Sequence, residues 1–392
     1  NVTLSLDQYN DPVYPISPAT IGNNAELILT GGSIGGMATT SHSINATDAN
    51  PTNTIFTFRG NALFNGSDLG GTNPFTTVNI VNTIALGGGT NLASDNVNLV
   101  AENSSILLWG GAIQSNIINA FGSTANISLQ TNGGGTVKGS IGTAESPLSK
   151  VNFLDDLTMV FDASDTTANT IDVYAPITTS TNNTGTFSPY NGTINTFDDI
   201  GTPTNNIKDI QLNYDNSSST RDTTLIINSG DGNTRSIYAP ITTTSDQHNT
   251  LTTNNVSALF ARDIGNSGAS LAAVNFNGTG KETIGFNSGQ AMNIYAQNIS
   301  LDQVNLDLDQ SHAFVFSSTN NVTINNSTLS GAETIISAPS LVFSGDIVMK
   351  TMYRGDRTIL DVTGSSAIDT SALTSLTFDV FNYAGGPVSP VS

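Results

Sequence analysis

The sequence predicts an all-β fold, a right-handed parallel β-helix, from three observations. Two short phrases recur along the 392 residues, apolar alternations of strand length lie between them, and Asn, Thr, Ser and Gly make up most polar positions. This composition suits strands and turns and holds few strong helix formers. A strand that returns every twenty-odd residues with no helix between is typical of a solenoid.

The first phrase is an apolar residue, two variable positions, a Val or Ile, a polar residue and another apolar residue. Its copies occupy residues 75–80, 148–153, 207–212 and 271–276, and their Val or Ile positions lie 151 − 78 = 73, 210 − 151 = 59 and 274 − 210 = 64 residues apart. The second phrase follows each copy, at 99–101, 173–179, 237–243 and 294–296. A turn of about 20–25 residues cannot bury its own apolar face, so we expect about 16–19 stacked turns with right-handed connections.

Along the chain, residues 1–50 come first and are rich in turn formers, including Pro12, Pro15 and Pro18. Residues 25–29 form their first convincing strand. We expect this region to be an irregular cap of the solenoid, because an open end exposes unpaired backbone groups. Residues 51–392 are then expected to form the parallel β-helix itself.

Apolar alternation assigns the faces of the strands that follow. In segment 171–177 the odd positions are apolar and predicted to face inward, and in segment 304–309 the even positions are. Pro176 and Pro240 cannot donate to a strand ladder, so each marks the end of a strand. Asn79, Asn152 and Asn275 hold matched places in the first phrase. They are either rungs of side-chain ladders between turns or ordinary exposed strand residues.

Three polar segments are expected to leave the solenoid as loops: residues 180–196, 215–222 and 350–357. Residues 373–383 return to strand character before the sequence ends. The chain begins with Asn1, shows no signal peptide and stops without any sign of completion, so we expect a fragment of a longer protein.

Charge and composition exclude several classes of function. The chain has 31 acidic and 11 basic residues and a net charge of −20, so it lacks the basic clusters that bind nucleic acid or an anionic membrane. It has no cysteine, which excludes disulfides and thiolate metal sites. No stretch approaches the roughly 18–20 apolar residues of a membrane helix, so we expect no direct membrane insertion of this segment.

Residues 139–153, which read Gly-Ser-Ile-Gly-Thr-Ala-Glu-Ser-Pro-Leu-Ser-Lys-Val-Asn-Phe, resemble repeated segments in one family of surface proteins. The family is the passenger region of rickettsial surface autotransporters of the outer-membrane protein A and B type. Echoes occur at residues 200–202 and 264–266, and the resemblance covers roughly residues 55–300. It implies export through the protein's own C-terminal β-barrel translocator, which lies outside this segment, and a place on the bacterial cell surface as an adhesin or protein coat. It supplies no catalytic residue.

Motifs of catalysis are absent from the sequence. The three histidines, His42, His248 and His312, have no metal-binding spacing, and neither a nucleophile elbow nor a nucleotide-binding loop occurs. We therefore expect no enzyme activity, no metal and no cofactor. The alternative is a carbohydrate-cleaving solenoid of the polysaccharide lyase or tailspike kind, with Asp307 and Asp309 as its acidic pair. A further hypothesis is that the chain is a purely structural coat protein.

Two features are candidates for binding a host-cell surface protein or glycan. Arg354, Gly355 and Asp356 form the tripeptide that many integrins read, in a segment where Gly355 permits a tight turn. The plainer interpretation is a turn with paired surface charges. Tyr174 and Tyr238 are predicted to project from equivalent positions, and outward tyrosines of this kind can stack on sugars or on a protein partner. Packing across turns beneath a loop is the alternative.

Overall fold

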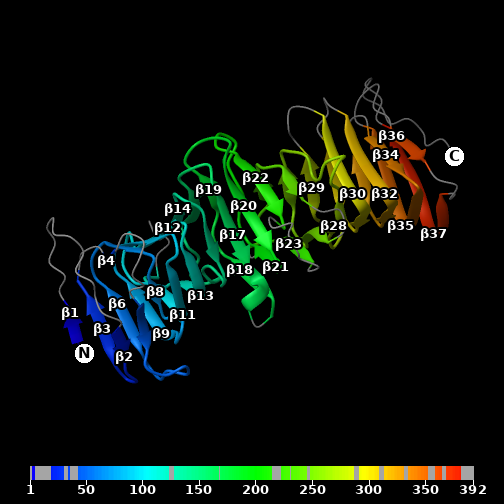
Figure 1. Cartoon of the computed structure of the whole chain (residues 1–392). Coiled ribbons are helices and arrows are strands. Elements are labelled where there is room, and N and C mark those ends of the chain that lie inside the picture. The colour runs from blue at the N-terminus through cyan, green and yellow to red at the C-terminus, as the bar shows by residue number, and fades with distance from the viewer. Residues whose placement is uncertain are drawn as a thin grey trace. The chain divides into compact units, whose positions relative to one another are not determined.

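The computed structural model describes residues 2–4, 19–30, 34–35, 43–122, 128–166, 168–213, 222–229, 231–244, 248–286, 291–308, 313–330, 334–351, 358–363 and 368–380. These residues form 37 strands and a single short 3-10 helix, Ala163–Asp165. The strands pair in parallel and stack as a β-solenoid (Figure 1). The prediction of an all-β parallel β-helix is confirmed.

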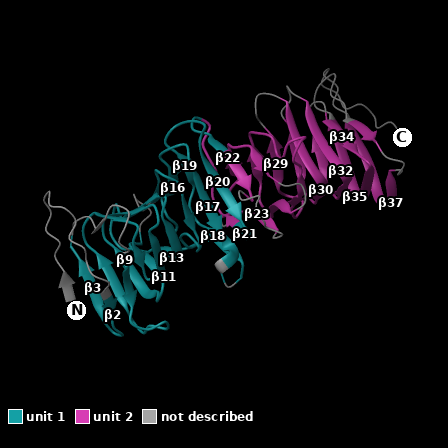
Figure 2. Ribbon diagram, in the orientation of Figure 1, with its two compact units in different colours: residues 1–194, 204–208 teal, residues 195–203, 209–392 magenta. Residues whose placement is uncertain are grey.

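The chain divides into two compact units, shown in Figure 2. Unit 1 holds residues 1–194 and 204–208, and unit 2 holds residues 195–203 and 209–392. The strands β21 (Gly192–Thr196) and β22 (Ile207–Leu212) contribute residues to both. Together the units hold about 13 turns rather than 16–19. Several turns are longer than expected: in-register partners are 177 − 151 = 26 residues apart for Val151 and Ile177, and 241 − 210 = 31 for Ile210 and Ile241.

Unit 1 contains two long parallel ladders. The first runs in the order β1 (Val2–Leu4), β3 (Glu26–Leu29), β6 (Ile55–Phe58), β9 (Phe75–Ile80), β11 (Asn91–Leu99), β13 (Ala112–Asn119), β15 (Gly135–Val137), β17 (Thr158–Asp162) and β20 (Thr184–Tyr190). The second runs in the order β4 (Ile34–Gly35), β7 (Ala62–Asn65), β10 (Thr83–Gly87), β12 (Ser105–Trp109), β14 (Ser128–Thr131), β16 (Lys150–Phe153) and β19 (Ile177–Thr179). The remaining strands are β2 (Ala19–Ile21), β5 (Ser43–Ala46), β8 (Asp68–Leu69) and β18 (Thr170–Val173).

Unit 2 is built in the same way. One ladder runs in the order β23 (Thr223–Asn228), β26 (Asn249–Asn254), β28 (Leu271–Asn277), β30 (Met292–Asp302), β32 (Phe314–Asn325), β35 (Ser340–Thr351), β33 (Thr328–Ser330), β31 (Asn305–Leu308), β29 (Thr283–Phe286), β27 (Ala258–Phe260) and β24 (Arg235–Ile237). Beside this ladder, β34 (Thr334–Ala338) pairs with β32 and with β36 (Thr358–Val362), and β37 (Asp369–Val380) pairs with β35. Strand β25 (Ile241–Thr243) pairs with β22 instead.

The described part of residues 1–50 joins the same ladders as the rest of unit 1. Strand β3 pairs with β6 over four residues, from Glu26 with Ile55 to Leu29 with Phe58. The role of residues 1–50 as a cap stays a prediction. The strand expected at residues 25–29 is confirmed as β3. Of the strand expected at 373–383, residues 373–380 lie in β37, and residues 381–383 lie outside the described residues.

The predicted faces are confirmed where the structure describes them. The odd positions of 171–177 are buried and the even ones half-buried, and Val304, Leu306 and Leu308 are buried. Pro176 lies between β18 and β19, and Pro240 lies between β24 and β25, so both prolines mark strand ends as expected. The apolar positions of all four first-phrase copies are buried as well.

The first-phrase copies do not stack on one another. Val78 pairs with Val97, Val151 pairs with Leu129, and Val274 pairs with Leu251, in three separate ladders. Asn79, Asn152 and Asn275 are therefore not rungs of one ladder. Two of them bond to polar side chains of neighbouring turns: Asn98 Nδ2 donates to Asn79 Oδ1 at 3.2 Å, and Asn152 Nδ2 donates to Ser180 Oγ at 2.9 Å.

The loop expected at residues 180–196 is mostly strand instead. Strands β20 and β21 occupy it, and Phe187 and Ile194 are fully buried there. Its many Thr residues are good strand formers, which outweighs its polar composition. Of the other two expected loops, residues 215–221 and 352–357 lie outside the described residues.

Asparagine builds many of the corners between strands. Among the described residues, ten other than glycine have a positive φ, and these are Asn24, Asn53, Asn103, Asn169, Asn183, Asn191, Asn213, Asn255, Gln303 and Asn326. Asn tolerates this left-handed backbone better than other residues with a Cβ, because its short amide bonds to the nearby backbone. The high Asn content is thus partly a requirement of the turns.

Candidate functional site

A recurrent backbone corner carries both of the tyrosines singled out from the sequence. We call it the Ile-Gly corner, and its three copies are Ile141-Gly142, Ile200-Gly201 and Ile264-Gly265. The partner tyrosines are Tyr174, Tyr238 and Tyr295, whose backbone N–H groups donate to the Ile carbonyls at 2.8, 2.7 and 2.8 Å. The glycines have φ values of 69°, 76° and 72°, a left-handed conformation that favours glycine.

A polar side chain completes each Ile-Gly corner. The residue before the Ile is Ser140, Asp199 or Asp263, and its side-chain oxygen accepts the backbone N–H of the second residue before the tyrosine, at 3.0, 2.7 and 2.8 Å. The Ile N–H donates to the carbonyl of that same residue in each copy. The corners that carry the family resemblance therefore share one hydrogen-bond pattern.

Tyr174 and Tyr238 occupy equivalent backbone positions, as the sequence predicted. Both side chains are half-buried, and Tyr174 belongs to unit 1 while Tyr238 belongs to unit 2. Burial raises the pKa of the Tyr174 phenol, and the Asp172 and Glu145 carboxylates raise it further. The phenol therefore stays a neutral hydrogen-bonding group at physiological pH. Whether these tyrosines bind a partner stays a prediction.

The remaining sequence candidates are only partly visible. Arg354, Gly355 and Asp356 lie outside the described residues, as do Asp309, His42 and His312. Asp307 is exposed on β31, in register with Gly285 and Ser330. His248 is half-buried, with its Nδ1 3.0 Å from Asp222 Oδ1. The structure thus does not test the integrin tripeptide or the acidic pair of the carbohydrate-cleaving alternative.

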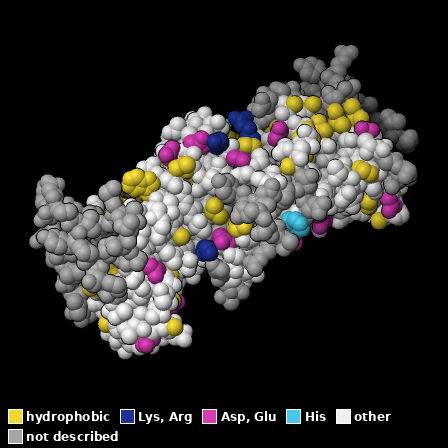
Figure 3. Space-filling model, viewed as in Figure 1, with side chains coloured by type: hydrophobic (Ala, Val, Ile, Leu, Met, Phe, Trp, Pro, Cys, Tyr) yellow, Lys and Arg dark blue, Asp and Glu magenta, His cyan; other side chains and the backbone are white. Residues whose placement is uncertain are grey.

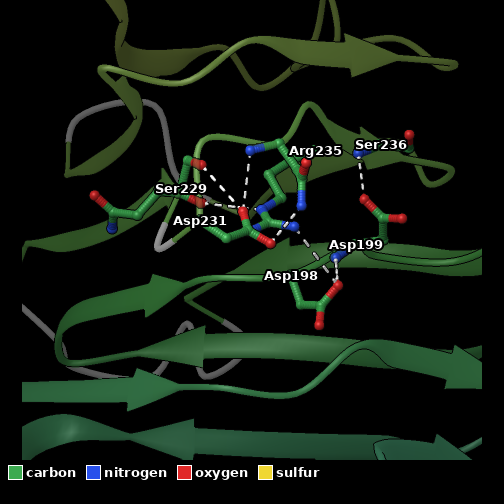
Figure 4. Close-up of polar contacts among 8 residues, drawn as sticks. Asp198, Asp199, Ser229, Asp231, Arg235 and Ser236 are labelled. Carbon is green, nitrogen blue, oxygen red and sulfur yellow. Dashed lines mark hydrogen bonds and ion pairs between the residues drawn. The ribbon is translucent and has the colours of Figure 1, made fainter. Parts of the chain in front are cut away.

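A buried arginine organises a charged cluster that sequence analysis did not identify (Figure 4). Arg235 opens β24 and is only 6% exposed. Its guanidinium donates to Asp231 Oδ1 and lies 3.9 Å from Asp198 Oδ1, and its Nε donates to the Asn228 carbonyl at 3.4 Å. A buried cation needs such partners, so these contacts are accounted for by the need to stabilise Arg235 inside unit 2.

The pKa values of the two carboxylates around Arg235 are shifted in opposite directions. Burial raises the pKa of Asp198, and the neighbouring Asp199 and Asp231 charges add to this, against the backbone N–H of Asp199 and the Arg235 charge. The pKa of Asp231 is lowered, chiefly by the backbone N–H of Asn233, which donates at 3.0 Å. In Figure 4 the Asp198 and Asp231 side chains approach Arg235, while Asp199 bonds to Ser236.

Replacing Asp198 by Asn tests this arrangement. Because its pKa is raised in the fold, the folded state binds more protons than the unfolded state just above pH 3.8, the ordinary value. Stability of the parent chain therefore falls as pH rises through this window. We expect Asp198→Asn to match the parent in urea midpoint below pH 3.8 and to be more stable at neutral pH, by a small margin since the carboxyl keeps 38% of its surface exposed.

The measurement is a series of urea denaturation curves between pH 3 and 8 for both proteins. Arg235 keeps Asp231 as its partner in the variant, so the cluster itself survives. A difference in midpoint that stays constant across this range would show that Asp198 titrates alike in the folded and unfolded chains.

Exposed apolar side chains are a feature that the sequence analysis missed. In unit 1 those of large size are Trp109, Phe121, Leu154 and Leu157. Trp109 is the most exposed of them at 54% and is the only tryptophan of the chain. The signal was present in strand 105–109, where Ile106 and Leu108 alternate inward and place Trp109 on the outer side.

Within the described ranges, no group of three or more His, Asp or Glu side chains is placed to hold a metal ion. The described residues also include no helix with the length and apolar character of a membrane span. Comparison with protein-family models, with curated proteins and with solved structures finds no match to this chain.

Proposed function

We propose that this chain is a non-enzymatic segment of an autotransporter passenger, held on the outer surface of a bacterium, where it acts as an adhesin or surface-layer stalk. Its partners are a host-cell surface protein or glycan and, for export, a C-terminal β-barrel translocator of the same protein. The observation that carries the proposal is the Ile-Gly corner. Its three copies coincide with the residues that resemble the rickettsial passengers, and they belong to a solenoid of the kind such passengers are expected to form.

The solenoid supports this function physically. Each turn hides its apolar side chains in the interior, so the outer side chains are free to vary without loss of the core. Figure 3 shows a surface that is mostly uncharged and polar, with few Lys or Arg and scattered hydrophobic side chains. Such a surface suits contact through many small patches and corners.

The test presents beads coated with the purified chain to cultured animal cells. Beads coated with an unrelated protein of similar negative charge are the control. We expect the chain to raise attachment several-fold over the control, with no release of sugar from any glycan tested. Attachment no better than the control would refute the adhesive role.

The same assay separates the two alternatives. Release of reducing sugar that disappears in both Asp307→Asn and Asp309→Asn would favour a carbohydrate-cleaving enzyme, because those residues form its proposed acidic pair. Ordered self-assembly on a surface without attachment or sugar release would favour a structural coat.

A further inference from the structure

Three of the four large exposed apolar side chains of unit 1 lie on one corner of the solenoid. We call it the Trp109 corner. It joins the second ladder of unit 1 to the first and consists of residues 65–66, 87–89, 109–110, 132–134 and 154–157. Trp109, Leu154 and Leu157 lie on it, and Phe121 does not. In Figure 3 hydrophobic side chains lie beside acidic and basic ones along the upper edge of this unit.

Strand register places the residues of this corner in one column. Gly87 pairs with Trp109, and the pairs Leu108–Thr131 and Thr131–Phe153 bring Asn132 and then Leu154 next in line. Asn65 precedes Gly87 in the same way, since Phe64 pairs with Leu86. At about 4.8 Å per turn the column from Asn65 to Leu154 is about 19 Å long.

Glycines leave the indole of Trp109 accessible. A Cβ on Gly133 would come within 2.1 Å of Trp109 Cδ1, so the indole packs directly against that backbone on the following turn. On the preceding turn, a Cβ on Gly88 would meet nothing within 4 Å, and the same holds for Gly66 one turn further. The indole is thus supported on one side by the Gly133 backbone. On the preceding turn the Asn65 side chain lies over Gly87, and the space beside Gly88 is open.

Polar groups surround Trp109 and Leu154 on the Trp109 corner. The amides of Asn65 and Asn132 are exposed in the column itself, and the carboxylates of Asp155 and Asp156 are exposed beside Leu154. Asp156 Oδ2 accepts Lys208 Nζ at 2.8 Å, so the one lysine contacting this group is paired with a carboxylate. The Trp109 corner therefore presents an aromatic ring next to hydrogen-bonding groups. Among these residues no positive charge is left unpaired.

We propose that the Trp109 corner is a binding site for a neutral glycan that runs along the column. A sugar ring has an apolar face of C–H groups that can stack on the indole, while its hydroxyls donate to Asn and Asp oxygens and accept from the Asn amides. The net charge of −20 and the exposed Asp155 and Asp156 repel sialylated or sulfated chains. This inference rests on the proposed adhesive function for its biological role and names the class of ligand.

The single tryptophan makes the test direct. The full chain is titrated with three neutral oligosaccharides, maltotetraose, chitotetraose and lacto-N-neotetraose, and with heparin, while Trp109 fluorescence is recorded. We expect at least one neutral probe to change the emission with saturation, and heparin to leave it unchanged. No change with any neutral probe, or saturation by heparin alone, would overturn the inference.

Variants assign the binding to this corner. Isothermal titration with the neutral probe that binds is expected to show at least tenfold weaker binding for Trp109→Ala, because a stacked aromatic anchor is lost. Gly88→Leu should weaken binding similarly, since its side chain occupies the open space on the preceding turn, where an added Cβ would meet no atom within 4 Å. Phe121→Ala, which removes an exposed aromatic ring away from the corner, is the matched control and should bind like the parent. Equal affinity in all four proteins would refute the site.

Bead attachment distinguishes this inference from the proposed function. Parent beads that attach to cells equally well with Trp109→Ala, and that bind no neutral probe, would leave the adhesive role standing and refute the glycan site. Neutral-probe binding lost in Trp109→Ala, together with no attachment of parent beads, would support the glycan site and refute the adhesive role.

Discussion

Replacing Phe276 by alanine is expected to destabilise unit 2 by about 3–5 kcal/mol, the cost of emptying a large buried aromatic site. Phe276 is fully buried on β28 and touches two further rings, Phe260 at 5.9 Å and Phe286 at 6.0 Å between centroids. Phe286 in turn contacts Phe314 at 4.3 Å. A cavity at Phe276 therefore removes contacts from a connected group of rings, which packs the interior over successive turns.

The measurement is the urea midpoint of the full chain, together with hydrogen exchange of the amides in β26, β28 and β30. Phe378→Ala is the matched control in the same unit, because Phe378 is 54% exposed on β37, and its loss should change stability by less than about 0.5 kcal/mol. If the two variants shift the midpoint equally, the ring group has no special part in the core.

Replacing Gly265 by alanine is expected to cost about 3 kcal/mol, from two independent causes. Its φ of 72° is strained for a residue with a Cβ, and the added Cβ would lie 2.2 Å from the Tyr295 carbonyl oxygen. The backbone must shift, which weakens the bond from the Tyr295 N–H to the Ile264 carbonyl. The amide of Tyr295 should then exchange faster with solvent.

Gly268→Ala provides the control from the same turn. Gly268 does not have a left-handed φ, and its added Cβ would approach only Asn266 Oδ1, at 3.4 Å. We expect it to change the urea midpoint little and to leave exchange at Tyr295 unaltered. Equal loss of protection in both variants would mean that any side chain in this turn disturbs the corner.

The sequence predicts the architecture well because the deciding features are local. Alternation with a period of two marks which side of a strand is buried, and this holds for Val304, Leu306 and Leu308. Proline interrupts a ladder wherever it occurs, so Pro176 and Pro240 mark the ends of strands correctly. Neither inference needs knowledge of what lies next to the strand in space.

Pairing between turns depends on contacts between residues far apart in the chain, and sequence patterns predict it poorly. Val78 and Val151 occupy the same place in the same phrase but pair in different ladders, because the length of each turn decides which strand comes next. The segment 180–196 was expected to be a loop from its polar composition, although its few apolar residues, Phe187 and Ile194, are buried in strands. Register depends on contacts that composition does not reveal.

The candidate sites also include one feature that was predictable from the sequence and one that was not. The equivalence of Tyr174 and Tyr238 was predictable, because both sit in copies of one phrase. The Trp109 corner was not, because its column is assembled from five turns whose sequences have little in common. Only the lone tryptophan beside Gly110 and Gly111 pointed to it, and that clue gains meaning once the Gly133 backbone is known to pack against the indole.

The asparagines at left-handed corners have a chemical consequence over time. Asparagine is among the residues that heat and age degrade, and hydrolysis of its side-chain amide leaves aspartate. Each such event adds one negative charge to a chain that already carries −20, at a place where the backbone reverses direction. Old preparations should therefore become more acidic, in part at these bends.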